Sequence, residues 1–138
     1  MIRLALRSAA LASMVVLSAC DSSSTGLSAG SAVTITSGVP VTGLSGGASS
    51  RSLYRIVVPA GSTRLVVETH GGTGDVDLLI RRNRVPTLVE STCESFNAGN
   101  EDGCDLTNPA PGDWYILLFT PGDHSFSGAT LTATVTTP

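Results

Sequence analysis

The sequence predicts an all-β protein, a β-sandwich or barrel of about seven or eight short strands. Three observations predict this fold. After residue 19, no segment shows the period of an amphipathic helix. Short runs with apolar residues at every second position alternate with turns rich in glycine and proline. The run from Trp114 to Phe119 is apolar on both faces, as expected for a central strand of a packed sheet.

The first twenty residues have the pattern of an export signal. Arg3 and Arg7 precede an apolar run that is shorter than the roughly 20 residues needed to span a membrane. The run ends in Leu17-Ser18-Ala19-Cys20, which resembles the lipobox of bacterial lipoproteins. That resemblance implies cleavage before Cys20 and attachment of acyl chains such as palmitate, which would anchor the protein in the lipid bilayer of the cell membrane or outer membrane. The other interpretation is an uncleaved N-terminal helix with a chance cysteine.

Three regions follow from this assignment. Residues 1–19 are expected to be the cleaved signal peptide. Residues 20–37 are rich in Ser, Thr, Gly and Ala, which is typical of a flexible tether. Residues 38–138 carry the strand pattern and are long enough for one β-sandwich domain.

Each strand of the domain is predicted by its own run. Pro40 restricts the first strand to an edge of a sheet, because proline cannot donate a backbone hydrogen bond. A Gly/Ser loop is expected over 44–50 and a long loop over 83–103. Strands are expected over 39–41, 52–58, 64–69, 75–82, 104–107, 113–120 and 129–137.

The predicted mature chain is acidic. It has six arginines, no lysine and eleven acidic residues, so its formal charge is −5. An acidic domain is a poor candidate for nucleic-acid binding, which needs a basic face. The basic cluster at 81–84 is better explained as a solvated strand end or turn.

Two cysteines remain once Cys20 is assigned to lipid attachment. Cys93 and Cys104 form an even pair in a chain predicted to be exported, where disulfides form and persist. A metal site is the rival interpretation, but no histidine or further cysteine lies nearby at ligand spacing.

Several motifs follow one another in a recognisable order. One strand ends in Pro59-Ala60-Gly61, and a glycine-rich turn at 71–74 leads into Asp75-Val76-Asp77-Leu78. Asn100-Glu101 lies between the two cysteines, and Pro111-Gly112-Asp113-Trp114 opens the run before the last strand. In this order the motifs resemble the bacterial pre-peptidase C-terminal domain, or PPC domain, over nearly all of residues 38–138.

The resemblance implies a jelly-roll-like antiparallel β-sandwich without catalytic activity, of a kind that usually accompanies secreted peptidases. Similar modules of clostridial collagenases bind collagen and calcium. We therefore expect a non-catalytic, lipid-anchored cell-envelope module that binds a protein, a peptide or a polysaccharide. The alternative is a structural or secretion-related accessory domain without a ligand, in one version stabilised by calcium. Leu79 departs from the family, which often has an aromatic residue there, and Asp102-Gly103 lengthens the loop.

Two Gly-x-Ser-x-Gly strings, at 26–30 and 43–47, raise the question of a serine hydrolase. A nucleophile elbow needs a strand before the serine and a helix after it, and neither string has that context. His70 and His124 are the available bases and are expected to be solvent-exposed loop residues.

Two sets of residues are candidates for ligand binding. A pair of carboxylates on one strand face repels unless a cation or a donor compensates, so the acidic residues suggest a Ca²⁺ site. The alternative is that Asp75 caps the glycine turn and Asp77 pairs with an arginine. An exposed tyrosine on a sandwich face could contact a sugar or a peptide. The calcium candidates are Asp75, Asp77, Glu101, Asp102, Asp105 and Asp113, and the aromatic candidates are Tyr54 and Tyr115.

Overall fold

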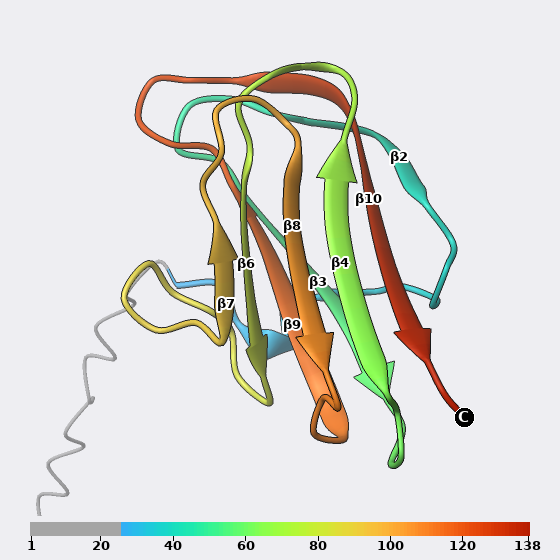
Figure 1. The fold of residues 1–138 in the computed structure, drawn as a ribbon. Helices are drawn as coiled ribbons and strands as arrows, with labels where there is room; N and C mark the ends of the chain where they lie inside the picture. The colour runs from blue at the N-terminus through green and yellow to red at the C-terminus, as the bar shows by residue number, and fades with distance from the viewer. Residues whose placement is uncertain (1–25) are drawn as a thin grey trace, which may run out of the picture.

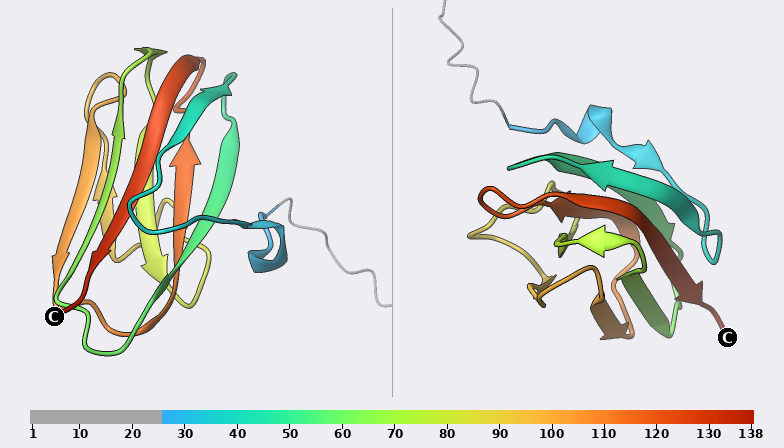
Figure 2. Two further views of the ribbon diagram at one scale, coloured as in Figure 1. Left: turned by 90° about the vertical axis from the view of Figure 1, so that its right-hand side faces the viewer. Right: turned by 90° about the horizontal axis from the view of Figure 1, so that it is seen from above.

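The computed structural model describes residues 26–138, which form two β-sheets packed face to face (Figures 1 and 2). Sheet A has the strand order β1-β3-β9-β6-β7, and sheet B has the order β2-β10-β4-β8, with β5 paired to β10. The strands of sheet A are β1 Val33–Thr34, β3 Arg51–Val58, β6 Asp77–Arg82, β7 Cys93–Ser95 and β9 Gly112–Phe119. Those of sheet B are β2 Val41–Gly46, β4 Arg64–His70, β5 Thr73–Gly74, β8 Asp102–Thr107 and β10 Phe126–Thr136.

The predicted fold class is confirmed. The two-sheet sandwich has ten strands rather than the predicted seven or eight. The prediction missed β1, β5 and β7, which are only two or three residues long. Such short strands carry too few residues for an alternating pattern to be recognised. Within the described residues, the single helical element is the one-turn 3₁₀ helix η1, Ala29–Ser31, and no helix is long and apolar enough to cross a bilayer.

The core lies between the sheets and follows the alternation of the strands. β9 is the middle strand of sheet A, as its two apolar faces predicted, and Ile116 and Leu118 point into the core. From sheet B, Leu65 and Val67 of β4 pack against them. Other buried members are Ile56, Val58, Val76, Leu78, Ile80, Cys104, Trp114, Phe126, Ala129, Leu131 and Ala133.

The predicted loop over 44–50 is wrong in its first half. β2 begins at Val41, directly after Pro40, and continues to Gly46 as an edge strand of sheet B. Its pairing with β10 shifts register twice. Such irregularities are tolerated at an edge, and they let a strand rich in glycine and serine pair without an alternating pattern.

The predicted tether is ordered in its second half. η1 and β1 both lie within residues 29–34, and Ile35 is buried in the core. The composition of this segment concealed its role because it is held by backbone pairing to β3 rather than by an amphipathic pattern. Cys20, the signal peptide and the first residues of the expected tether lie outside the described residues.

Three further boundaries differ from the prediction. β6 begins at Asp77 rather than at residue 75, so Asp75 belongs to the preceding turn. The expected loop over 83–103 contains β7, and β8 begins two residues earlier than expected. The lowest-numbered residues of β10 pair with β2 and β5, which extends that strand back to Phe126.

The disulfide between Cys93 and Cys104 is confirmed. Their Cα atoms are 6.0 Å apart, within the usual range for a disulfide. Cys93 lies on β7, an edge of sheet A, and Cys104 lies on β8, an edge of sheet B. The bond therefore joins the two sheets along one open side of the sandwich.

Candidate functional site

The glycine turn before β6 packs directly against the backbone at the start of β10. Gly72 and Gly74 have positive φ angles of 69° and 98°. A Cβ atom at either position would collide with the backbone carbonyl of Ser127 or of Ser125. Both positions therefore require glycine, for its conformation and for the close approach.

Asn100 holds this turn in place from the loop between β7 and β8. Its Nδ2 donates to the carbonyl oxygens of Gly71 and Thr73 at 2.8 and 3.1 Å. The neighbouring Glu101 accepts from the backbone N–H of Gly71 at 2.9 Å. The sequence identified Asn100-Glu101 only as part of the disulfide loop, because nothing in the local pattern shows which distant carbonyls an asparagine reaches.

Asp75 and Asp102 fasten the same loop through backbone N–H groups. Oδ1 of Asp75 accepts from the N–H of Gly99 at 2.9 Å, and its Oδ2 lies 3.4 Å from Nδ1 of His124. Oδ1 of Asp102 accepts from Ser95 Oγ at 2.5 Å and from the N–H of Asn97 at 2.9 Å. Asp75 thus does cap a loop by side-chain to backbone bonding, but the loop it caps is at Gly99 and not its own glycine turn.

Two buried carboxyl groups at this end of the sandwich, Asp77 and Asp102, have raised pKa values. Burial, followed by the charges of Asp75 and Asp102, raises the pKa of Asp77 to about 6. Burial also raises the pKa of Asp102, against the opposing effect of its hydrogen bonds from Ser95 and Asn97. Among residues 26–138, Oδ2 of Asp102 and Oδ1 of Asn100 are buried acceptors without a hydrogen-bond partner. Protonation of Asp102 would convert one of these acceptors into a donor.

A shallow depression of about 450 Å³ adjoins this cluster where β4 ends and β8 begins. Glu68, His70 and Glu101 are exposed at its rim, whereas Thr69 and Asp102 are buried. The backbone N–H of Asp102 donates to Thr69 Oγ1 at 3.3 Å. The lining residues are Glu68, Thr69, His70, Glu101, Asp102 and Gly103. We call this feature the acidic depression.

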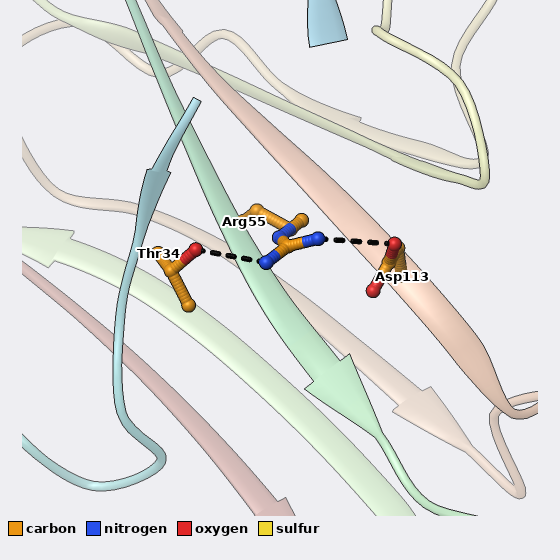
Figure 3. A network of polar contacts seen from close by, with 3 residues as sticks. All are labelled: Thr34, Arg55 and Asp113. Carbon is orange, nitrogen blue, oxygen red and sulfur yellow. Dashed lines mark hydrogen bonds and ion pairs between the residues drawn. The ribbon is translucent and has the colours of Figure 1, made fainter. Parts of the chain in front are cut away.

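The six calcium candidates do not form one site. Asp105 pairs with Arg64 on sheet B. Asp113 pairs with Arg55 on sheet A at 3.3 Å (Figure 3). In the described part of the chain, no group of three or more His, Cys, Asp or Glu side chains has a geometry that could hold a metal ion. Asp105 and Asp113 therefore lie apart from the other calcium candidates, and the alternative pairing of Asp77 with an arginine is not found among residues 26–138.

The prediction that Tyr54 and Tyr115 are surface residues is wrong. Each is only 8% exposed. Tyr54 lies in the core between the sheets, where burial raises its pKa. Tyr115 belongs to a second buried cluster on the outer face of sheet A. Phe96 is half exposed instead, because it lies in the loop after β7 where no neighbouring strand covers it.

The two candidate serines have structural roles. Ser28 caps η1, where its Oγ accepts from the N–H of Gly30 at 3.2 Å. Ser45 lies within β2, and its Oγ donates to Ser127 Oγ at 3.4 Å. His124 contacts Asp75 rather than a serine. Neither serine is part of a catalytic triad in the described residues.

A model of the bacterial pre-peptidase C-terminal domain matches residues 50–120. The chain belongs to the PPC family. The match covers the strands from β3 to β9 together with the glycine turn and the disulfide loop.

Related sequences come from bacterial proteases. Alkaline serine exoprotease A of Vibrio alginolyticus is 37% identical over 99 residues, which is 72% of this chain and 18% of that protein. The extracellular protease of Xanthomonas campestris pv. campestris is 40% identical over 100 residues, 72% of this chain and 17% of that protein. The chain thus spans less than a fifth of either relative, and the matched part is the PPC domain and not the catalytic domain.

Solved structures agree with the fold. The solution structure of vEP C-ter 100 has a TM-score of 0.58 and 30% identity, covering 72% of this chain and 96% of that one. The PPC domain of a collagenase from Bacillus anthracis has a TM-score of 0.54 at 12% identity, covering 75% and 94%. PliG of Aeromonas hydrophila, a periplasmic inhibitor of g-type lysozyme, has a TM-score of 0.59 at 14% identity, covering 76% and 96%. The last two likenesses concern the fold alone.

Proposed function

We propose that this chain is an exported, non-catalytic binding module that a lipid on Cys20 holds at the cell envelope. Its membership of the PPC family supports the non-catalytic role, since only that domain of the protease relatives is matched. Export is supported by relatives named as extracellular proteases and by the disulfide. The lipid anchor rests on the sequence before Cys20.

The acidic depression is the proposed binding surface, and it is the observation that carries the proposal. Its rim offers the exposed carboxylates of Glu68 and Glu101 and the imidazole of His70. Behind it, Asn100 and Asp102 fasten the loop that supplies Glu101, so the surface is formed before a ligand arrives. A bound protein, peptide or polysaccharide would place amino, guanidinium or hydroxyl groups there, which are the natural partners of carboxylates.

The proposal does not depend on a calcium ion, since two of the acidic candidates already have partners within the protein. Asp75 already accepts from Gly99 and contacts His124, and Glu101 accepts from Gly71. These contacts would have to break before the carboxylates could gather around a cation.

Co-sedimentation tests the proposal. The mature chain, residues 20–138 with Cys20→Ser for solubility, is incubated with insoluble collagen, chitin, cellulose and peptidoglycan, with Ca²⁺ and with chelator. Retention on one polymer, equal in both conditions, would support a calcium-independent binding module and identify its ligand class. Retention on none would favour the alternative of a structural or secretion-related accessory domain.

A further inference from the structure

Residues 26–35 form a segment that includes β1 and lies at the edge of sheet A, beside β3 (Figure 2). We call this segment the strap. β1 runs parallel to β3, with Val33 opposite Tyr54 and Thr34 opposite Arg55. The N–H of Ile35 donates to the carbonyl of Arg55 at 2.9 Å. The strap therefore completes sheet A as an added edge strand.

The surface next to the strap is apolar, although it belongs to the outer face of sheet A. Leu53, Leu79, Tyr115 and Leu117 alternate with core residues along β3, β6 and β9, and they form a separate buried cluster. Leu53 and Leu79 are both opposite Leu117 in the strand register. Outward-facing residues of a sandwich are normally polar, so an apolar cluster here requires a cover.

The strap supplies part of that cover. Leu27 and Ala32 pack against the outer cluster, together with Val85 and Phe119 from the domain itself. Both strap residues are half-buried rather than fully buried. Their contribution is therefore a lid over the apolar surface and not an extension of the main core.

One side-chain hydrogen bond, from Arg55 to Thr34, also connects the strap to the sheet. Arg55 and Arg81 are both opposite Tyr115 in register, on either side of it. Arg55 reaches from β3 to both neighbours, where it donates to Thr34 Oγ1 at 3.0 Å and to Asp113 at 3.3 Å (Figure 3). Arg55, Asp113 and Thr34 are each at least partly exposed, so water can replace the hydrogen bond between Arg55 and Thr34 at little cost.

Ile35 is the strap residue that is buried in the main core. The rest of the attachment is slight, because only two strap residues pair with β3 and Val33 is 57% exposed. The sequence from Gly26 to Gly38 carries no charged side chain. Recognition thus depends on backbone hydrogen bonds and small apolar side chains, which is the chemistry by which extended peptides add a strand to a sheet edge.

We propose that the edge of β3 and the outer cluster form a docking surface for an extended, uncharged peptide with small and aliphatic side chains. The strap is the competitor built into the chain, and it leaves when such a peptide binds. The partner pairs in parallel with Tyr54 and Arg55, and it places aliphatic side chains on the outer cluster and in the core position that Ile35 leaves. This surface lies on sheet A, away from the acidic depression on sheet B, so it is a second site with its own test.

The first experiment measures binding of a labelled peptide with the sequence of residues 26–36 to the mature chain carrying Cys20→Ser. The added substitutions Leu27→Ser and Ala32→Ser in the chain weaken the strap and leave the sheet intact. Because a strap that is mostly closed lowers the apparent affinity by the open fraction, we expect these substitutions to lower Kd at least about tenfold.

Matched controls decide the specificity. Val39→Ser in the chain removes an exposed apolar side chain outside the strap, and it should leave Kd unchanged. A peptide carrying Leu27→Ser and Thr34→Pro should not bind, since proline disrupts strand pairing. Equal Kd values for the strap variant and the Val39→Ser chain would overturn the proposal.

Hydrogen exchange on the chain without strap substitutions provides a second measurement that does not depend on a variant folding. The amide of Ile35 should exchange on the order of 100 times faster than that of Ile116 in β9, because local opening needs less free energy than global unfolding. Equal protection of the two amides would show that the strap does not open and would contradict the proposal. Dimers formed by exchange of straps would also contradict it, since the occupant would then be a second copy.

Discussion

Asn100 and Asp102 are the residues on which the order of the acidic end depends. Asn100 bonds the carbonyls of the glycine turn, and Asp102 bonds Ser95 and Asn97 within its own loop. Each also keeps one buried acceptor without a partner in the described residues. These hydrogen bonds hold the loop in place. At the same end of the sandwich Asp77 and Asp102 are buried, and burial raises the pKa of both carboxyl groups.

Replacing Asn100 tests the brace. Asn100→Ala removes two hydrogen bonds, to the carbonyl oxygens of Gly71 and Thr73, and two such bonds together contribute about 1–3 kcal/mol. We expect a loss of unfolding free energy in that range, measured by urea denaturation. Asn97→Ala is the matched control, because its amide is exposed and water can replace its bonds. Equal losses in the two variants would contradict the assigned role.

The raised pKa of Asp77 predicts how stability changes with pH. In the folded chain this carboxyl group keeps its proton up to a pKa of about 6, whereas the ordinary value is 3.8. Between these values the folded state binds more protons than the unfolded state, so the unfolding free energy falls as the pH rises through this window. Asp102, whose pKa is also raised, contributes in the same direction.

Asp77→Asn should therefore stabilise the protein at pH 7.5, by about 1–3 kcal/mol, and flatten the pH dependence. Urea unfolding at pH 5 and pH 7.5 measures both effects. The exposed Asp123→Asn provides a control with the same change of charge. The assignment fails if the original chain is less stable at pH 5 than at pH 7.5 and Asp77→Asn behaves in the same way.

At the scale of the elements, the edges of the two sheets distinguish this sandwich. β7 and β8 are edge strands joined by the disulfide, and β1 is an edge strand supplied by the strap. Edge strands need protection from unwanted pairing. One side of the sandwich is closed covalently, and an edge of sheet A is covered by a segment that pairs through only two residues.

Removal of the disulfide should destabilise the domain without changing its fold. The bond closes a loop between residues 11 positions apart, and a crosslink of this size contributes about 2–4 kcal/mol. Cys93→Ala with Cys104→Ala should lose stability of this order in chemical denaturation, whereas Cys20→Ala should lose none. A double variant as stable as the original would show that β7 and β8 are held by packing alone.

The sequence predicted the long strands well and the short ones poorly. β3, β4 and β9 were located to within one residue at each end, because six or more alternating or apolar residues define a strand by themselves. β1, β5 and β7 were missed because their pairing depends on distant partners. The strand predicted over 39–41 shares only Val41 with β2, since the glycines and serines of β2 resemble a loop and only its pairing with β10 makes it a strand.

The candidate site was predicted only in part, because its contacts also depend on residues that are distant in the sequence. The motif around Asp75 and Asp77 was identified, and Glu101 and Asp102 do line the depression. Asp105 and Asp113 were grouped with them although register places them beside Arg64 and Arg55. Tyr115 was expected to be exposed because a single sequence does not reveal that an outer face has its own cover.

At the scale of the whole molecule, the proposed anchor and the strap are close in the sequence. Only the residues between Cys20 and Gly26 separate the proposed lipid from the first described residue, a reach of at most about 20 Å. A docked strap would therefore keep the sandwich near the bilayer, and release of the strap would let the domain move farther from it. The anchor and the docking surface would then act on the same segment.

Cys20→Ser tests the anchor in cells. The full chain, residues 1–138, should partition with the membrane fraction of a bacterial host, and its mass should show loss of residues 1–19 with gain of acyl chains. Cys20→Ser should abolish the lipid and release the protein from membranes, whereas the neighbouring Ser23→Ala should not. An unlipidated protein in the membrane fraction would instead support an uncleaved N-terminal helix.

The most direct test of the central claim, that this is a binding module acting through the acidic depression, is co-sedimentation of matched charge variants. Glu68→Gln with Glu101→Gln removes two charges at the rim and keeps the shape of both side chains. Glu90→Gln with Glu94→Gln removes two charges beside and on β7, on sheet A. We predict retention of the unsubstituted mature chain on one of the four polymers, a reduction of at least about tenfold in the rim variant, and no change in the other. Retention on none of the polymers, or an equal reduction in both variants, would contradict the claim.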